Sequence, residues 1–133
     1  FVYCDGGARG NPGPAAAAIV VEKEGKVIHK ESKYLGRGTN NEAEYSGAIL
    51  GLEWVLKNVL TDEQEITFIM DSQLVANQLS GKFKVKNENL RNCFFTAKTI
   101  EKKIPTRIIY QSVSRERNKI ADFLVNKELD ENS

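Results

Sequence analysis

Four acidic side chains stand where packing alone gives little reason for a charge. Asp5 ends a short apolar segment, and Asp71 directly follows another. Glu44 and Asp122 precede apolar residues at helical spacing, so each shares the apolar face of an expected helix. A carboxylate on a packed face costs free energy unless it is paired or bound to a metal ion. Oxygen ligands without His or Cys suit Mg²⁺ or Mn²⁺ and not zinc, so these acids predict a divalent-cation site.

Each acid except the first also has a simpler explanation. Asp71 could cap a short helix over residues 72–80, and Glu44 could stabilise the first turn of its helix through the helix dipole. Asp122 could pair with Lys119 or with a nearby arginine. Asp5 is harder to explain in this way, because two glycines follow it at the end of a strand.

The elements that must position these acids follow from periodicity and turn signals. The pattern predicts strands over residues 1–5, 15–24, 26–34, 66–70 and 106–113, and helices over residues 42–60, 72–80, 87–103 and 118–129. Residues 6–14 form an expected turn, and residues 35–41 an expected loop. Thr39 and Glu42 fit a capping box at the start of the longest helix. This order predicts an α/β fold with a mixed sheet covered by helices.

Composition limits the possible classes of protein. The chain has 133 residues, of which 41% are hydrophobic and 28% charged, which is typical of one globular domain spanning residues 1–133. No apolar run approaches the roughly 20 residues of a membrane span, so no membrane partner is expected. The two cysteines, Cys4 and Cys93, provide neither a disulfide framework nor a zinc site.

Charge is segregated along the chain although the net charge is only +1. Residues 82–119 contain 11 basic and 3 acidic residues, whereas residues 1–81 contain 7 basic and 11 acidic residues. The basic block is either a solvated face or a surface for a polyanion. The glycine-rich turn over residues 6–14 matches neither the dinucleotide nor the nucleotide loop pattern, which leaves a stiff turn or a close approach to a polymer backbone.

Four segments of the chain resemble the type 1 ribonuclease H family in order and spacing. They are Y-C-D-G-G with G-N-P-G-P over residues 3–14, T-N-N-E-A-E over residues 39–44, D-S-Q over residues 71–73, and N-K-I-A-D over residues 118–122. The resemblance implies a five-stranded mixed sheet, three strands antiparallel and then two parallel, with flanking α-helices. It also implies hydrolysis of the RNA strand of RNA–DNA hybrids, which leaves 5′-phosphate and 3′-hydroxyl ends.

The resemblance assigns roles to individual residues. It implies that Asp5, Glu44, Asp71 and Asp122 hold two Mg²⁺ ions, for which Mn²⁺ is an expected substitute, and that Glu44 senses the ribose 2′-hydroxyl. The residues expected to bind substrate lie in the turn, the helix starts and the basic segment: Gly6, Asn11, Thr39, Asn40, Asn41, Gln73, Lys82, Lys84, Lys86 and Asn118.

Two departures from the family pattern affect these expectations. Many members carry a His before the last acid, whereas the single His here, His29, falls in an expected strand. Arg115 is the candidate for the missing group; it cannot act as a base, but it can hold a phosphate. This loop resembles an archaeal-type subgroup, some of whose members cut double-stranded RNA, so that duplex is a second expected substrate. The long basic handle is replaced by a short segment in which lysines alternate with Phe83 and Val85.

Other readings of the same residues remain open. A module that binds hybrids or double-stranded RNA without cutting them is the main alternative. The four acids argue against it, because a site without catalytic activity has no need of such a costly cluster. Another nuclease on the same fold is a third reading, against which the T-N-N and D-S-Q segments argue. A cytoplasmic monomer is expected.

Overall fold

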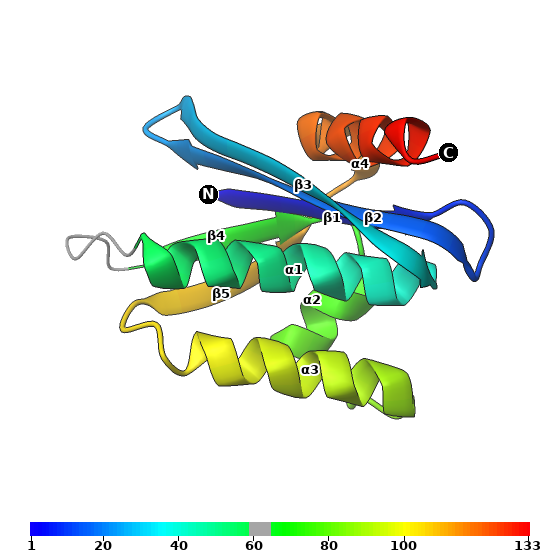
Figure 1. The fold of residues 1–133 in the computed structure, drawn as a ribbon. Helices are drawn as coiled ribbons and strands as arrows, with labels where there is room; N and C mark the ends of the chain where they lie inside the picture. The colour runs from blue at the N-terminus through cyan, green and yellow to red at the C-terminus, as the bar shows by residue number, and fades with distance from the viewer. Residues whose placement is uncertain (59–64) are drawn as a thin grey trace.

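Residues 1–58 and 65–133 are described in a computed structural model, and they contain one five-stranded sheet (Figure 1). The strand order is β3-β2-β1-β4-β5. β1 (Val2–Ala8), β2 (Gly13–Lys23) and β3 (Lys26–Gly38) pair antiparallel, whereas β4 (Glu65–Met70) pairs parallel to both β1 and β5 (Arg107–Ser112). This arrangement confirms the expected mixed sheet with three antiparallel strands followed by two parallel ones.

The first three strands are longer than the sequence pattern predicts. β1 continues from Asp5 through residues 6–8 because their backbone groups pair with residues 15–17 of β2, despite the weak strand preference of glycine. β3 likewise continues through residues 35–38, which were expected to form a loop. The tight hairpin at Glu24 and Gly25 is confirmed, since both residues have positive φ, 54° and 78°.

Four α-helices and a short 3₁₀ turn, η1 (Arg115–Arg117), complete the described chain. α1 (Asn40–Lys57) begins two residues earlier than predicted, and residues 59 and 60 of the predicted helix lie outside the described part. The expected capping box is present, because the Thr39 hydroxyl accepts from the Glu42 N–H while Glu42 accepts from the Thr39 N–H. α2 (Gln73–Leu79), α3 (Glu88–Glu101) and α4 (Lys119–Glu131) agree with the predicted helices to within two residues at each end.

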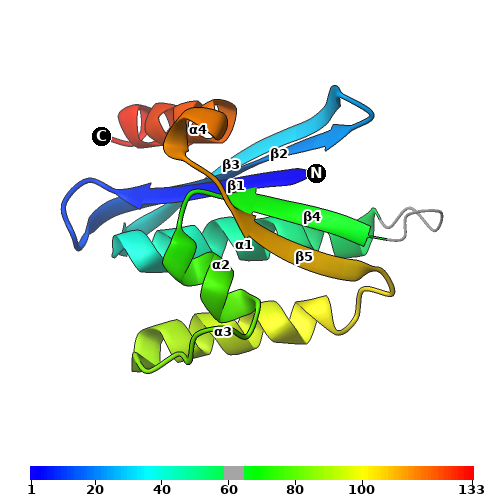
Figure 2. The ribbon, with the colours of Figure 1, turned by 180° about the vertical axis from the view of Figure 1, so that it is seen from behind.

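The helices divide unequally between the two faces of the sheet (Figures 1 and 2). α1, α2 and α3 lie on one face above the larger core, whereas α4 lies alone on the other. The side chains that alternate along β2 show why the two cores differ in size. Ile19 and Val21 point into the larger core, whereas Ala16 and Ala18 point toward α4. None of the described helices is long and apolar enough to cross a membrane.

Candidate active site

The parallel pairing of β1 with β4 brings the first two acids together. Tyr3 lies opposite Ile69, so Asp5 and Asp71, each two residues further along, lie just beyond the end of this pairing. A carboxylate oxygen of one lies within 4.8 Å of one of the other. Asp5 is 4% exposed, and the Asp71 side chain is 12% exposed. The short helix that follows is capped by Ser72, whose hydroxyl accepts from the Val75 N–H at 3.2 Å, so capping does not explain Asp71.

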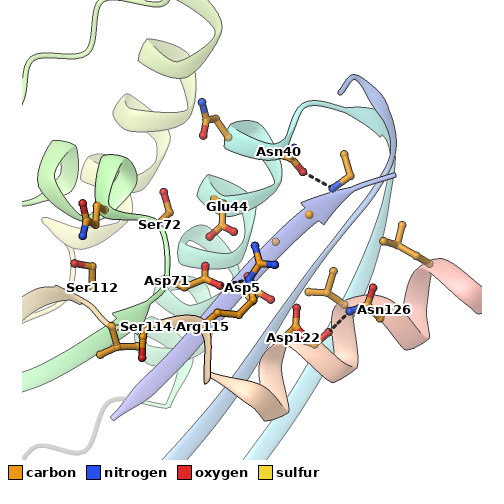
Figure 3. Close-up of a pocket in the computed structure, with 18 of the residues that line it drawn as sticks. Asp5, Asn40, Glu44, Asp71, Ser72, Ser112, Ser114, Arg115, Asp122 and Asn126 are labelled. Atoms are coloured by element: carbon orange, nitrogen blue, oxygen red, sulfur yellow. Dashed lines mark hydrogen bonds and ion pairs between the residues drawn. The ribbon is translucent and has the colours of Figure 1, made fainter. Parts of the chain in front are cut away.

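Glycines allow the third acid to approach the other two. A Cβ at Gly6 would overlap the Ala43 carbonyl, and a Cβ at Gly47 would lie 2.6 Å from the Asp5 carbonyl oxygen. The first turns of α1 therefore pack directly on the backbone of β1, as only glycine permits. This contact places the Glu44 side chain over Asp5, as Figure 3 shows.

Asp5, Glu44 and Asp71 form a compact carboxylate cluster. Each offers one oxygen, and the three oxygens lie within 4.8 Å of one another. Burial, followed by the charge of Asp71, raises the pKa of Asp5 to about 7. Burial, followed by the charges of Asp5 and Asp71, raises the pKa of Glu44 to about 10. Glu44 Oε2 is buried without a hydrogen-bond partner. A divalent cation fits this cluster, since it would neutralise the charges and occupy the unpaired oxygen.

The fourth acid and the arginine stand at the edge of the cluster. Asp122 is on the first turn of α4, on the far side of Asp5 from α1 (Figure 3). It is not one of the three closest acids of the described chain, but its charge also raises the pKa of Asp5. Arg115 Nε lies 3.6 Å from Asp71 Oδ2, and its side chain is 79% exposed. Within the described residues, Asp122 forms no ion pair with Lys119 or with an arginine, the simpler explanation considered for it, and Arg115 faces Asp71 instead.

These residues line an open, mainly polar groove of about 840 Å³, which we call the acidic groove. Of the predicted substrate-binding residues, Gly6, Asn40, Asn41 and Gln73 line it. It also contains Arg9 and Ser72, which lie within the turn and the D-S-Q segment but were not assigned a role. Three further polar residues lie outside the motifs and join the groove only in the fold: Ser112, Ser114 and Asn126.

A second, smaller polar pocket of about 190 Å³ contains Asn11 and Thr39. Asn87 and Asn89, at the start of α3, complete its wall. No motif in the sequence indicates these two asparagines, because only the packing of α3 against α1 brings them to this pocket. Asn41 lines both this pocket and the acidic groove, so the two hollows adjoin at the start of α1.

Asn118 does not fit the prediction that it contacts substrate. It is 1% exposed, and its Nδ2 donates to the Cys4 carbonyl at 2.8 Å. Its backbone carbonyl also accepts from the Asp122 N–H at 3.1 Å. The side chain therefore ties the start of α4 to β1 beside Asp5, which is a positioning role, and it has no surface to offer to a duplex.

The basic block does not form one surface. Lys82, Lys84 and Lys86 are exposed on the segment between α2 and α3, which we call the lysine segment, residues 82–86. The segment is anchored by Arg91, whose guanidinium donates to the Val85 and Lys86 carbonyls. The predicted alternation is incomplete, since Val85 packs on the core but Phe83 is 52% exposed.

The middle of the basic block lies far from the acids, although Arg115 near its end lies beside Asp71. Lys102 and Lys103 follow α3, and Arg107 begins β5 with its guanidinium 3.5 Å from Glu65. Asp71 follows the opposite end of the neighbouring strand, about 20 Å away at 3.3 Å per residue. The whole block therefore cannot be one grip on a ligand that lies in the acidic groove. His29 is a strand residue, as expected, and stacks on Trp54.

A mixed five-stranded sheet with carboxylates converging beside adjacent strands defines the ribonuclease H-like class of folds. Residues 3–128 match the family model described as reverse transcriptase-like. The structure of LC11-RNase H1 in complex with an RNA/DNA hybrid is 37% identical, with a TM-score of 0.93, and the match covers 98% of this chain and 96% of that one. The chain belongs to the type 1 ribonuclease H family.

Two further relatives include an archaeal member of this family. Ribonuclease HI of Halobacterium salinarum is 36% identical over 130 residues, which cover 97% of this chain and 63% of that protein. A bifunctional protein of Mycobacterium tuberculosis is 42% identical over 131 residues, which cover 97% of this chain. The chain spans only 35% of the length of that mycobacterial relative.

Proposed function

We propose that this protein is a divalent-cation-dependent endoribonuclease that hydrolyses the RNA strand of RNA–DNA hybrids, giving 5′-phosphate and 3′-hydroxyl ends. The observation that carries the proposal is the cluster of Asp5, Glu44 and Asp71 in an open polar groove. The similarity to a structure described as a complex with an RNA/DNA hybrid supports the choice of substrate.

In this proposal Asp5, Glu44, Asp71 and Asp122 hold two Mg²⁺ ions, which Mn²⁺ can replace. The oxygen-only donor set and the unpaired Glu44 Oε2 support the assignment. Bound cations of this kind activate a water nucleophile and stabilise the charge on the leaving oxygen. Glu44 also faces the ribose 2′-hydroxyl, the group that distinguishes RNA from DNA.

Polar side chains around the groove position the duplex. Asn41 and Gln73 lie along the acidic groove, where amide groups can hydrogen-bond to base edges and sugars in the minor groove. Asn40 also lines the groove, but its Oδ1 accepts from the Ala8 N–H and its own N–H donates to Asn11, so its Nδ2 is the group that can donate to the duplex.

Thr39 and Asn11 lie in the adjoining pocket, whose hydroxyl and amide groups can donate to a DNA phosphate. Glu42 also lines this pocket, with its carboxylate turned to the Thr39 N–H. The Thr39 oxygen accepts from Glu42 but keeps its own hydrogen to donate to a phosphate.

Arg115 is the proposed anchor for the scissile phosphate or the product. Its guanidinium is exposed at the rim and lies near Asp71 without a tight ion pair, so it is free to turn toward an entering anion. It cannot act as a general acid or base, because a guanidinium keeps its protons and its charge. Its role is therefore electrostatic.

The lysine segment supplies binding that does not depend on sequence. Replacing Lys82, Lys84 and Lys86 by Ala should weaken hybrid binding and reduce the slope of log affinity against log salt by up to about 2–3, since each phosphate contact releases about one counterion. The matched control replaces Lys102 and Lys103, which lie at the far end of α3. An equal effect of both sets of substitutions on the salt slope would remove the lysine segment from the proposed interface.

The experiment that tests the proposal compares cleavage of an RNA–DNA hybrid, double-stranded RNA and double-stranded DNA, each with Mg²⁺, Mn²⁺ or EDTA. Cation-dependent cleavage of the hybrid is expected, with the phosphate on the 5′ end of each product. We also propose that the protein cuts double-stranded RNA. If double-stranded RNA is not cut, the proposed substrate is the RNA–DNA hybrid alone. Tight hybrid binding without cleavage under any cation would favour a binding module. A cytoplasmic, monomeric enzyme remains a prediction.

A further inference from the structure

The turn between β1 and β2 is tied to two different helices at one end of the acidic groove. On one side it is fixed to the start of α1. Asn40 Oδ1 accepts from the Ala8 N–H at 2.9 Å, and the Asn40 N–H donates to Asn11 Oδ1 at 3.0 Å. On the other side, Arg9 reaches across to α4. The turn therefore links the helix that carries Glu44 with the helix that carries Asp122.

Arg9 makes two contacts with the second half of α4. Its Nη2 lies 2.6 Å from Asp130 Oδ1 and donates to the Asn126 carbonyl at 3.3 Å. Asn126 in turn donates through Nδ2 to the Asp122 carbonyl at 3.1 Å. Arg9 thus holds the helical turns that directly follow Asp122.

The apolar attachment of α4 to the sheet is thin, so these polar contacts matter. The core beneath the helix consists of Val125 and Leu129 packed on Ala16 and Ala18, with Leu124 beside them. Alanine methyl groups bury little apolar surface and contribute correspondingly little free energy. The orientation of α4 therefore depends on polar contacts near its two ends. Asn118 holds the start, and toward the end Arg9 acts beside Glu128, which accepts from the Ser32 hydroxyl of β3 at 2.7 Å.

Helix geometry gives the size of the effect on Asp122. With the start of α4 held at Asn118, Asp130 lies about 18 Å and Asp122 about 6 Å along the axis, at 1.5 Å per residue. A displacement of Asp130 is therefore passed to Asp122 at about one third of its size. Metal–ligand distances are held to within roughly 0.2 Å, so a displacement of Asp130 by about 0.6 Å is enough to disturb Asp122 as a ligand.

We propose, building on the proposed function, that Arg9 is a positioning residue of the metal site. Through Asp130 and the Asn126 carbonyl, it sets how far Asp122 lies from the cluster of Asp5, Glu44 and Asp71. It thereby sets the affinity of the site for its second divalent cation. Arg9 itself touches neither the cation nor the reacting phosphate in this role.

A direct contact between Arg9 and the nucleic acid is the competing role. Arg9 lines the groove and its side chain is 44% exposed, so a phosphate can reach it. The two roles differ in their dependence on Asp130. A positioning Arg9 acts only through α4, whereas a phosphate-binding Arg9 would act without Asp130 and would bind substrate more strongly once that acid is removed.

The test uses Arg9→Gln, Asp130→Asn and the double variant, with Arg9→Lys as the conservative replacement and Lys127→Gln as a control on the exposed face of α4. Two quantities are measured: the Mn²⁺ binding isotherm of the free protein, by calorimetry, and the cation dependence of hybrid cleavage. Each single variant should weaken the binding of the second Mn²⁺ ion about tenfold. Substitutions of residues that orient metal ligands lower metal affinity by roughly 10- to 100-fold, and this expected loss is at the low end of that range. The double variant should add little to that loss, because both substitutions remove one contact.

The same variants should shift the cation concentration for half-maximal cleavage by a similar factor, while KM for the hybrid stays unchanged at saturating cation. Arg9→Lys should recover most of the loss, and Lys127→Gln should match the unmodified protein. A raised KM confined to Arg9→Gln, with unchanged Mn²⁺ binding, would overturn the proposal in favour of a phosphate contact. Unchanged Mn²⁺ binding in both single variants would also overturn it. If the unmodified protein fails to cut hybrids, the proposed function fails, but the Mn²⁺ isotherms still decide the role of Arg9.

Discussion

The crowded carboxylates should make the metal-free protein less stable as the pH rises. The pKa values of Asp5 and Glu44 are raised in the folded protein to about 7 and about 10, mainly by burial. In the unfolded chain both groups ionise near pH 4. Their contribution to stability is therefore present in full below about pH 4 and is lost as the pH rises toward the folded values, because the folded state retains protons that the unfolded state releases.

The size of this loss follows from the two shifts. Each group costs about 1.4 kcal/mol per pH unit between its unfolded and folded pKa. From pH 5 to pH 7 both groups contribute, so the free energy of unfolding should fall by up to about 5 kcal/mol. Glu44→Gln removes one of the two ionisations and should reduce that fall to about half. Above pH 7 the remaining loss in the unmodified protein comes mostly from Glu44.

Urea unfolding in EDTA at pH 5, 6, 7 and 8, followed by the fluorescence of the single tryptophan, Trp54, measures this dependence. Glu53→Gln is the matched control, because Glu53 is on the exposed face of the same helix, and it should leave the slope unchanged. A free energy of unfolding that stays level or rises from pH 5 to pH 8 would refute the electrostatic description of the cluster. So would equal slopes for Glu44→Gln and the unmodified protein.

Two further predictions concern buried contacts of α1. Gly6→Ala should destabilise the protein by about 1–3 kcal/mol or more, because the added Cβ would overlap the backbone of α1. Gly7→Ala should be nearly neutral, since its Cβ would meet only Val125 Cγ1 at 3.7 Å, and thermal unfolding compares the two variants directly. Tyr45→Phe should cost about 1–3 kcal/mol in urea unfolding, because it leaves the buried Gln78 Oε1, now 2.6 Å from the tyrosine hydroxyl, without a partner. An unaltered midpoint for that variant would show that Gln78 finds another donor.

Local signals allowed much of the fold to be predicted. The capping box at Thr39 and Glu42 uses residues three apart in the chain, so the start of α1 was predictable to within two residues. That Asp5 and Asp71 would be neighbours followed only if their two strands pair, and it is the structure that shows the pairing of β1 with β4. The lengths of β1 and β3 did not follow, since glycine-rich segments form strands here only because β2 offers them hydrogen-bond partners.

Contacts between distant segments explain what sequence reasoning missed. Asn118 belongs to a recognisable motif, yet only the fold shows that its side chain is buried against the Cys4 carbonyl. The contact between Arg9 and Asp130 joins residues 121 positions apart, and no periodicity or spacing relates them. The basic block is likewise divided only in the fold, since Lys102 and Arg107 lie at the far ends of α3 and β5, whereas Arg115 lies beside Asp71.

The central claim is that the carboxylate cluster performs cation-dependent cleavage of RNA paired with DNA. The most direct test is the rate of Mg²⁺-dependent hybrid cleavage by Asp71→Asn, compared with Glu53→Gln and the unmodified protein. The cluster predicts that Asp71→Asn loses cleavage by at least about a hundredfold while still folding, since a metal ligand is removed. It predicts that Glu53→Gln retains the full rate. Cleavage by Asp71→Asn at the rate of the unmodified protein would contradict the claim.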